Sequence, residues 1–582
     1  MLKQRRGNKT SVQEVALSNM GVSSTAQIND WFTRSYAGGY RIDGLDAAID
    51  ILDSRKWDRI QIVGDYDIDG CTATAQFRIV LKELGYPVYD RIPRRFSEGF
   101  GLNPRIVEEI PAEGQVLLIT CDNGIAATAA VDLAKSKGMT VIITDHHLPI
   151  MEDGKAVLPN ADLIIDPNAI PGSADFNGYC GAGLVYRLLC RLLDRKVEGA
   201  DEATTKRMKS MKAIIQPLAM MGTIGDVMEL REENYVIARN GLSKLAKRIA
   251  PTGLLALHDA LYIAEPTATD IGFKSGPCIN ANGRLHDAGA SESVNLLSAA
   301  EYKAAQAMAR EAIANNNTRK QQVTDGMRLA EQYIMANGYE DDLPLVVYLT
   351  GINEGIIGII AGKLQERYRT VCMVFTDSET PGVLKGSGRA PEGIDLKAML
   401  DQLSSYFVKY GGHEGAAGMS IEKKMLNDMR IAANKLSAAH GITRTTEAVL
   451  EYDLEIDADS ITDTLEETLK FAPFGQGNRP IVFKVTGFKL SPGPDGKMKT
   501  LLGKEGVKLY HGDTQAVSFT LAPQLMPSQA LSFTLYGTLA YSWFKGEKTP
   551  TVEIIDFEEE GMANNSSSTS LKQALQAIAA SR

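Results

Sequence analysis

The segment VLLITCDNG, residues 116–124, is a mostly apolar run that is followed directly by an aspartate, an asparagine and a glycine. A continuous apolar run of this length, ended by a turn residue, is typical of a β-strand buried on both faces. Such strands belong to parallel sheets, whose two faces are covered by helices. The segment therefore predicts an α/β fold with Asp122 at the end of a buried strand.

Residues on both sides of this segment repeat the pattern of a strand followed by a helix. The runs RIQIV at 59–63 and VIIT at 141–144 predict two more strands, and helices are expected at about 72–84 and 126–137. A further strand is expected at about 162–166. Strands and helices that alternate at this spacing indicate βαβ units and a parallel sheet.

The 582-residue chain is too long for one core, because about 150 residues per domain is usual. Alternating apolar runs with Gly and Pro turns toward the C-terminus predict a small OB-like β-barrel. The expected organisation is an N-terminal helical segment at 1–57, a parallel-sheet catalytic domain at 58–290, a long connector helix at 291–340, a second α/β domain at 341–445, the OB-like barrel at 446–560 and a flexible tail at 561–582.

Composition narrows the setting of the protein. The six cysteines form no CxxC pair, which argues against a zinc ribbon or a disulfide framework and favours a reducing cytoplasm. No window reaches the roughly 18 uninterrupted apolar residues of a membrane helix, and the basic N-terminus lacks a secretory apolar stretch. The net charge of −10 disfavours diffuse binding to nucleic acid but permits a local basic channel. We expect a cytoplasmic protein.

Acidic residues follow three of the predicted strands. The segment GDYDIDG at 64–70 follows the first strand, Asp122 follows the VLLITC strand, and Asp145-His146-His147 follows the VIIT strand. A fourth acidic residue, Asp226, comes after a helical stretch. Because the carboxyl ends of parallel strands face one crevice, these groups are expected to meet.

Crowded carboxylates stay ionised at neutral pH only when a cation lies between them. Aspartates with one or two histidines, and without a thiolate, suit Mn²⁺ or Mg²⁺ better than Zn²⁺. Two such ions can clamp a phosphoryl group and activate a water for in-line attack. Each acidic segment alone is more typical of a turn or a helix cap, but together they predict hydrolysis of a phosphate ester.

The four acidic segments resemble the signature of the DHH phosphoesterase family, with GDYDIDG, CDNG, TDHH and GTIGD in the family's order. The likeness covers roughly residues 40–560 and is closest to the RecJ-like branch. PCINANGRL at 277–285 is similar to that branch's PRINAAGRL segment. KGSGR at 385–389 and GGHEGAAG at 411–418 resemble the DHH-associated domain, and FAPFGQGN at 471–478 resembles the segment that opens the OB-like domain.

The resemblance implies a set of site residues. Asp122 is expected to bridge two ions, and Asp65 and His147 are expected to complete the catalytic set from behind the ligands or at the scissile phosphate. The implied metal ligands are Asp67, Asp69, Asp122, His146 and Asp226. The implied substrate-binding residues are Arg94, Arg95, Arg284, Gly386, Ser387, Gly412 and His413.

Alternatives stay open for the substrate contacts. Arg284 also suits a structural salt bridge, Arg94 and Arg95 an exposed basic face, and His413 a loop capped by glycines. One departure from the family is Asn353, which stands where a histidine is expected, so a phosphate or base contact there would be weaker.

The implied activity is 5′-3′ exonucleolytic removal of mononucleotides from single-stranded DNA with two Mn²⁺ or Mg²⁺ ions, in DNA repair or recombination. A monomer is expected, with a helicase or a single-strand-binding protein as partner. Two other functions remain open. A phosphodiesterase for short oligonucleotides or small nucleotides would usually lack the C-terminal barrel, and a non-catalytic RecJ-like replication subunit would have lost ligand residues.

Overall fold

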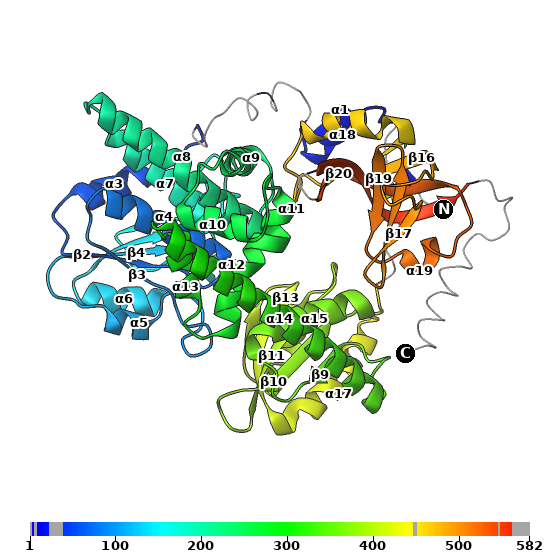
Figure 1. Cartoon of the computed structure of the whole chain (residues 1–582). Helices are drawn as coiled ribbons and strands as arrows, with labels where there is room; N and C mark the ends of the chain where they lie inside the picture. Colours follow the sequence, from blue (N-terminus) through cyan, green and yellow to red (C-terminus); the bar gives the residue numbers. More distant parts are fainter. Residues whose placement is uncertain are drawn as a thin grey trace. The chain divides into compact units, whose positions relative to one another are not determined.

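The computed structural model describes residues 3–4, 9–22, 29, 39–445, 451–544 and 547–560. They divide into two compact units (Figure 1), a smaller one within Met1–Phe32 and Ala448–Arg582 and a larger one within Thr33–Glu447. The predicted flexible tail at 561–582 lies outside the described residues. No helix in the described part of the chain has both the length and the apolar character to span a bilayer.

The first sheet of the larger unit confirms the predicted parallel α/β fold. Its strand order is β3-β2-β4-β5-β8, and all four pairings are parallel. The two faces of the buried strand explain its continuous apolar sequence, because Leu117 and Ile119 pack into one hydrophobic cluster and Val116 and Leu118 into another. The strands are β2 (Arg59–Val63), β3 (Val88–Arg91), β4 (Val116–Cys121), β5 (Thr140–Thr144) and β8 (Leu163–Ile165).

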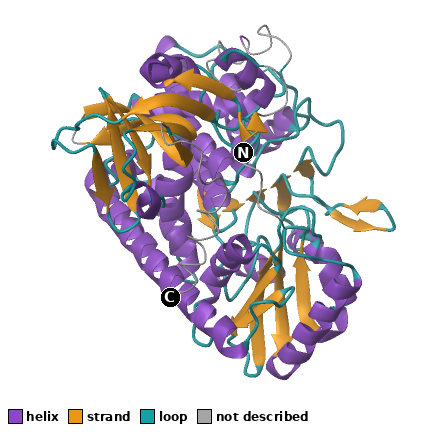
Figure 2. Ribbon diagram, turned by 90° about the vertical axis from the view of Figure 1, so that its right-hand side faces the viewer, coloured by secondary structure: helices purple, strands orange, loops and turns teal. Residues whose placement is uncertain are grey.

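Helices pack on both faces of the first sheet, and Figure 2 distinguishes the helices, strands and loops of the described residues by colour. The helices that contribute to one cluster include α3 (Leu45–Asp53), α4 (Ile68–Glu83), α7 (Gly181–Arg195) and α8 (Glu202–Gly225). The other cluster contains α5 (Pro104–Glu109) and α6 (Thr128–Ser136). A two-stranded hairpin, β6 (Ile150–Glu152) and β7 (Lys155–Val157), follows β5.

The helical part of the larger unit continues through α9 (Glu232–Ala246), α10 (Thr252–Ala260), α11 (Ala268–Asp270), the π-helix η1 (Ile271–Ser275), α12 (Gly276–Leu285) and α13 (Ala290–Leu297). The long helix α14 spans Tyr302–Asn337, and residues 298–301 separate it from α13. Glu301 has extended backbone at the start of α14, so the stretch expected to be one connector helix at 291–340 forms two helices.

The second sheet of the larger unit has the order β12-β13-β11-β10-β9. Only β9 and β10 are parallel, and α15 (Glu354–Tyr368) connects them. The strands are β9 (Leu345–Tyr348), β10 (Cys372–Asp377), β11 (Val383–Arg389), β12 (Phe407–Gly412) and β13 (Ala416–Glu422). The remaining helices are α16 (Leu396–Gln402) and α17 (Leu426–Ala439).

The smaller unit contains the predicted C-terminal β domain, a seven-stranded sheet with the order β15-β16-β20-β21-β19-β18-β17. Among the described residues, no pairing joins the first and last strands of this order. Two helices, α1 (Val12–Asn19) and α18 (Ile461–Leu469), pack together. The strands are β15 (Leu454–Asp457), β16 (Phe483–Lys489), β17 (Lys499–Leu502), β18 (Gly506–His511), β19 (Thr514–Ser518), β20 (Ser532–Phe544) and β21 (Glu547–Glu559).

Candidate active site

Asp122 lies directly after β4, with backbone in the left-handed region (φ 63°). Aspartate and asparagine adopt this conformation more readily than most other side chains. The neighbouring Asn123 fixes the turn, because its amide donates to the Val63 carbonyl (3.0 Å) and its oxygen accepts from the Leu102 amide (2.9 Å). The buried Asp122 carboxylate is thereby held at the carboxyl end of the sheet.

The three aspartates after β2 have different environments. Asp67 caps α4 by accepting from the amides of Asp69 (3.0 Å) and Gly70 (3.1 Å). Asp69 lies in the first turn of α4 and is fully buried. Asp65 is also buried, and its Oδ1 has no hydrogen-bond partner among the described residues. A buried carboxylate oxygen without a donor is costly unless a cation or a ligand supplies one.

The two histidines after β5 differ in charge. Burial lowers the pKa of His146, so its imidazole is neutral and its Nε2 can serve as a ligand. Burial also disfavours a charged His147, but the hydrogen bond from its Nδ1 to Asp145 (2.7 Å) and the Asp145 charge outweigh burial and raise its pKa to about 9. Asp145 therefore holds a protonated imidazole beside the acidic cluster.

The predicted metal-ligand residues meet at the carboxyl end of the first sheet. His146 Nε2 lies 3.0 Å from Asp122, 3.8 Å from Asp69 and 3.8 Å from Asp226. Three groups of three residues each have donor atoms that lie within 4.8 Å of one another. Asp122 and His146 each belong to two of these groups. The groups are Asp122, His146 and His147; Asp69, His146 and Asp226; and Asp65, Asp67 and Asp122.

The electrostatics of this cluster fit a site for divalent cations. Burial and neighbouring carboxylates raise the pKa of Asp65 and of Asp122 well above the usual range. The same causes, burial followed by the charges of Asp69 and Asp67, raise the pKa of Asp226 to about 8. Carboxylate oxygens with a single imidazole nitrogen suit Mn²⁺ or Mg²⁺. The donor set therefore fits these ions.

The pKa of Asp226 gives a prediction for metal-dependent stability. Without divalent ions the folded protein keeps a proton on Asp226 that the unfolded chain loses near pH ~4, so stability falls as pH rises toward ~8. A bound cation replaces this proton. We expect Mn²⁺ to raise the melting temperature above that in EDTA by more at about pH 8 than at about pH 6. Scanning fluorimetry measures both values, and an equal increase at the two pH values would contradict the prediction.

Two features that hold Asp69 were not predicted from the sequence. Its carboxylate accepts hydrogen bonds from the amides of Gly181 (2.6 Å) and Ala182 (2.9 Å), at the N-terminus of α7, where the helix dipole favours negative charge. A Cβ on Gly181 would lie 2.5 Å from Asp122 Cβ, and one on Gly222 would lie 2.4 Å from Asp69 Oδ1. Both glycines are required by the close packing around the acidic residues.

A group of arginines lies beside the acidic cluster. Burial, followed by the charges of Arg95 and Arg319, lowers the pKa of Arg284 to about 10, and Asp67 acts in the opposite direction. The Arg284 guanidinium donates to the Gly355 carbonyl (3.2 Å), and no ion pair joins it to a carboxylate among the described residues. The predicted alternative of a salt bridge is therefore not found, and the grouping favours binding of an anion.

Arg95, Arg319 and Arg389 extend this group. Arg95 stacks 4.4 Å from the Tyr66 ring centroid, and burial together with the charge of Arg95 lowers the pKa of Arg389. Arg389 donates to Ser387 Oγ (3.0 Å), which places the predicted Ser387 beside it. Arg319, on α14, has a buried Nε without a partner among the described residues. Neither Arg319 nor Arg389 was predicted as a site residue. Arg389 ends the KGSGR segment at 385–389, from which only Gly386 and Ser387 were predicted, and a single arginine on a helix such as Arg319 gives no recognisable signal.

The structure gives fewer contacts for the other predicted substrate-binding residues. Arg94 is exposed, and Gly386 lies in β11 against the Phe375 ring. Gly412 ends β12 with φ 146°, and His413 is exposed and accepts from the Gly415 amide (3.2 Å). Among the described residues, no hydrogen bond or ion pair joins His413 to the acidic cluster.

Asn353, the departure from the family, caps α15. Its side chain accepts from the Gly355 amide (2.7 Å). A Cβ on Gly355 would lie 2.2 Å from the Arg284 carbonyl oxygen, so α12 and α15 approach closely at this point. Asn353 thus has a structural role at the junction that positions Arg284.

Comparisons with known proteins agree with this arrangement. Residues 59–223 match the model of the DHH family, N-terminal domain, and residues 343–439 match the DHHA1 domain. The fold and the acidic site thus define a phosphoesterase of the DHH class. Proteins named single-stranded-DNA-specific exonuclease RecJ are 33% identical in Escherichia coli, over 66% of this chain and 67% of the relative, and 32% identical in Dickeya dadantii, over 75% and 77%. The chain belongs to the RecJ family.

Solved structures of RecJ share the fold. A crystal structure of RecJ with Mn²⁺ from Thermus thermophilus has a TM-score of 0.73 and 22% identity, and covers 96% of this chain and 77% of that one. A crystal structure of exonuclease RecJ bound to manganese has a TM-score of 0.56 and 27% identity, over 68% of this chain and 95% of that one. The predicted family and fold class are confirmed.

Proposed function

We propose that the protein is a metal-dependent exonuclease that hydrolyses the phosphodiester bonds of single-stranded DNA from the 5′ end and releases 5′-mononucleotides. The observation that carries the proposal is the meeting of Asp122, His146 and Asp226 with the aspartates that follow β2. The RecJ relatives, which are named for single-stranded-DNA-specific exonuclease activity, support the substrate class.

The metal site in this proposal uses Asp67, Asp69, Asp122, His146 and Asp226 to hold two Mn²⁺ or Mg²⁺ ions. Asp122 belongs to two of the three donor groups, which suits a bridging carboxylate with two oxygens. Bound divalent ions supply positive charge that stabilises a phosphoryl group under attack and activate a water. The α7 N-terminus orients Asp69, and Asn123 fixes the turn that carries Asp122.

Other side chains bind and orient the substrate in this proposal. The protonated His147, which Asp145 holds in place, donates a hydrogen bond to the scissile phosphate. Asp65, in the same acidic cluster, completes the catalytic set. Arg95 and Arg284 bind the 5′-terminal phosphate, with Arg94 nearby. Gly386, Ser387, Gly412 and His413 complete the contacts from the second α/β domain at 341–445.

In this proposal the width of a channel selects single-stranded DNA over duplex DNA. A channel that admits only one strand would exclude a duplex, which is roughly 20 Å across. The C-terminal β domain guides the strand by stacking and backbone charge. The protein acts as a monomer, and a helicase or a single-strand-binding protein delivers the strand during repair or recombination.

An assay on three substrates tests this function. Single-stranded DNA, blunt duplex and a dinucleotide, each 5′-labelled, are incubated with the protein and Mn²⁺. We expect labelled mononucleotide from the single strand at a rate at least ~10²-fold above that from the duplex, because the duplex must open before one strand can enter. Equal rates on single strand and duplex would refute the width argument. Cleavage of the dinucleotide alone would instead indicate a phosphodiesterase for small substrates, and no cleavage of any substrate a non-catalytic subunit.

A further inference from the structure

The strand β3 forms one edge of the first sheet. It pairs with β2, and no other strand adjoins it among the described residues. Pro87 and Arg91 accept hydrogen bonds from the β2 side, from the amides of Ile60 (2.9 Å) and Gly64 (3.2 Å). Because successive residues of a strand alternate, the backbone amide and carbonyl of Asp90 point away from β2. The edge therefore offers unpaired backbone groups.

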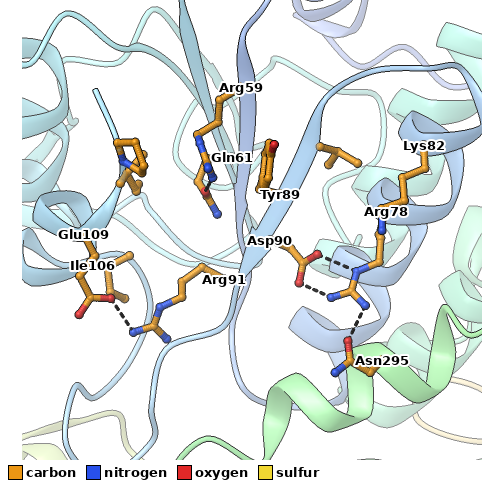
Figure 3. Close-up of a pocket in the computed structure, with 13 residues that line it drawn as sticks. Arg59, Gln61, Arg78, Lys82, Tyr89, Asp90, Arg91, Ile106, Glu109 and Asn295 are labelled. Carbon is orange, nitrogen blue, oxygen red and sulfur yellow. Dashed lines mark hydrogen bonds and ion pairs between the residues drawn. The ribbon is translucent and has the colours of Figure 1, made fainter. Parts of the chain in front are cut away.

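A surface hollow of about 720 Å³ surrounds this edge. Figure 3 shows its lining in two groups. Arg59 and Tyr89 belong to one face of the sheet, with the Arg59 guanidinium 3.7 Å from the Tyr89 ring centroid. Lys82 and Arg78 of α4 belong to the opposite face, where Arg78 forms an ion pair with Asp90. Basic side chains thus flank the open edge on both faces.

The charges around this edge do not cancel. The lining contains four cationic and two acidic side chains, although the whole chain has a net charge of −10. Arg78 is occupied by Asp90, and Arg91 by Glu98 and Glu109. No ion pair joins Arg59 or Lys82 to a carboxylate among the described residues. Each face of the edge therefore carries one cation, Arg59 or Lys82, that has no ion-pair partner in the described part of the chain.

We propose that the β3 edge binds an extended acidic segment of a partner protein, which adds a strand beside β3. Neighbouring residues of a strand point to opposite faces, so two consecutive carboxylates in the added strand would reach Arg59 on one face and Lys82 on the other. Main-chain hydrogen bonds to Asp90 supply affinity in this mode of recognition, and the flanking side chains supply specificity.

The chain's own undescribed segments do not provide this partner. They contain only two acidic residues, Asp30 and Glu447, which are far apart in sequence, and residues 561–582 contain none. The proposal is also separate from the nuclease activity. Arg59 begins β2, whereas the acidic site lies where the strands end, so the edge can be tested without measuring cleavage.

A binding assay with a labelled peptide tests the charge requirement. The probe is a fluorescent peptide with a run of aspartates between β-forming residues, and the readout is anisotropy with the whole protein. We expect saturable binding that the double variant Arg59→Gln/Lys82→Gln weakens roughly tenfold or more. The matched variant Lys363→Gln/Lys435→Gln, which removes two exposed lysines near the second sheet, should bind like the wild type. Absence of saturable binding, or equal weakening in both variants, would overturn the proposal.

A second pair of variants tests strand addition. Asp90→Pro and Asp90→Ala both remove the carboxylate, but only proline removes the outward backbone amide, and proline is tolerated on edge strands. We expect the peptide to bind Asp90→Pro roughly fivefold or more weakly than Asp90→Ala. Equal affinities would mean that the cations attract the peptide without an added strand, which would overturn the proposal. A single-stranded oligonucleotide with the same net charge as the peptide provides a further test in the Asp122→Asn background. Displacement of the peptide by this oligonucleotide would also overturn the proposal.

Discussion

Replacement of Asp122 by asparagine is expected to reduce cleavage of single-stranded DNA by at least ~10³-fold while leaving the protein folded. Asp122 belongs to two of the three donor groups at the acidic site, so its loss affects both proposed ions. Asparagine has the same shape and accepts the left-handed backbone at this position (φ 63°). Burial and the neighbouring carboxylates raise the pKa of Asp122, so its charge is disfavoured without a cation, and the neutral asparagine should not lower stability in EDTA.

Initial rates on a 5′-labelled single strand with Mn²⁺, together with melting temperatures in EDTA, check this result. The matched control is Asp153→Asn, because Asp153 also has left-handed backbone (φ 48°) but lies exposed in the turn between β6 and β7. The control should keep full activity. If Asp122→Asn kept activity within ~10-fold of the wild type, the bridging role would be wrong.

Gly181→Ala is expected to lower activity by ~10²-fold or more, although Gly181 carries no functional group. A Cβ there would lie 2.5 Å from Cβ and 2.8 Å from Cα of Asp122, and 3.0 Å from Asp69 Oδ2. The Asp122 backbone cannot shift easily, because its amide donates to the Thr144 carbonyl (3.0 Å). The clash therefore displaces a proposed ligand, and we expect a loss of stability of about 1–3 kcal/mol.

Gly183→Ala in the same helix is the control for this prediction. A Cβ at Gly183 has its nearest neighbour at 3.5 Å, an ordinary contact, and alanine favours a helix over glycine by about 1 kcal/mol. This variant should keep its activity and gain slightly in stability. Rates, Mn²⁺ affinity and urea unfolding of both variants provide the comparison, and equal behaviour of the two would contradict the close-packing argument.

The strands of the first sheet could be predicted from the sequence, because burial on both faces requires a continuous apolar run. Arg59–Val63 and Val116–Cys121 have the predicted bounds. The start of α4 was placed too late, because Asp67 acts as its N-cap and the helix begins at Ile68. Asp67 is both the N-cap of α4 and a proposed metal ligand. Its motif was interpreted as a metal site, so the start of the helix was missed.

The acidic site could be predicted because its members follow strands of one parallel sheet. The contacts that hold it could not. The hydrogen bond from Gly181 to Asp69 joins residues 112 positions apart, and a glycine in a helix N-terminus has no specific signal. Arg319 reaches the arginine group from α14, and the sequence alone does not give the rotation of that helix. The role of Asn353 as a helix cap likewise depends on where α15 begins.

Equilibrium binding of Mn²⁺ to the whole protein tests the central claim most directly, because the proposed chemistry requires a pair of ions at the end of the first sheet. Electron paramagnetic resonance of free Mn²⁺ counts the bound ions. The structure predicts two ions per chain in the wild type, and a loss of both at the same free Mn²⁺ concentration in Asp122→Asn. Unchanged binding in Asp122→Asn, or cleavage by a wild-type protein that binds no ion, would contradict the account.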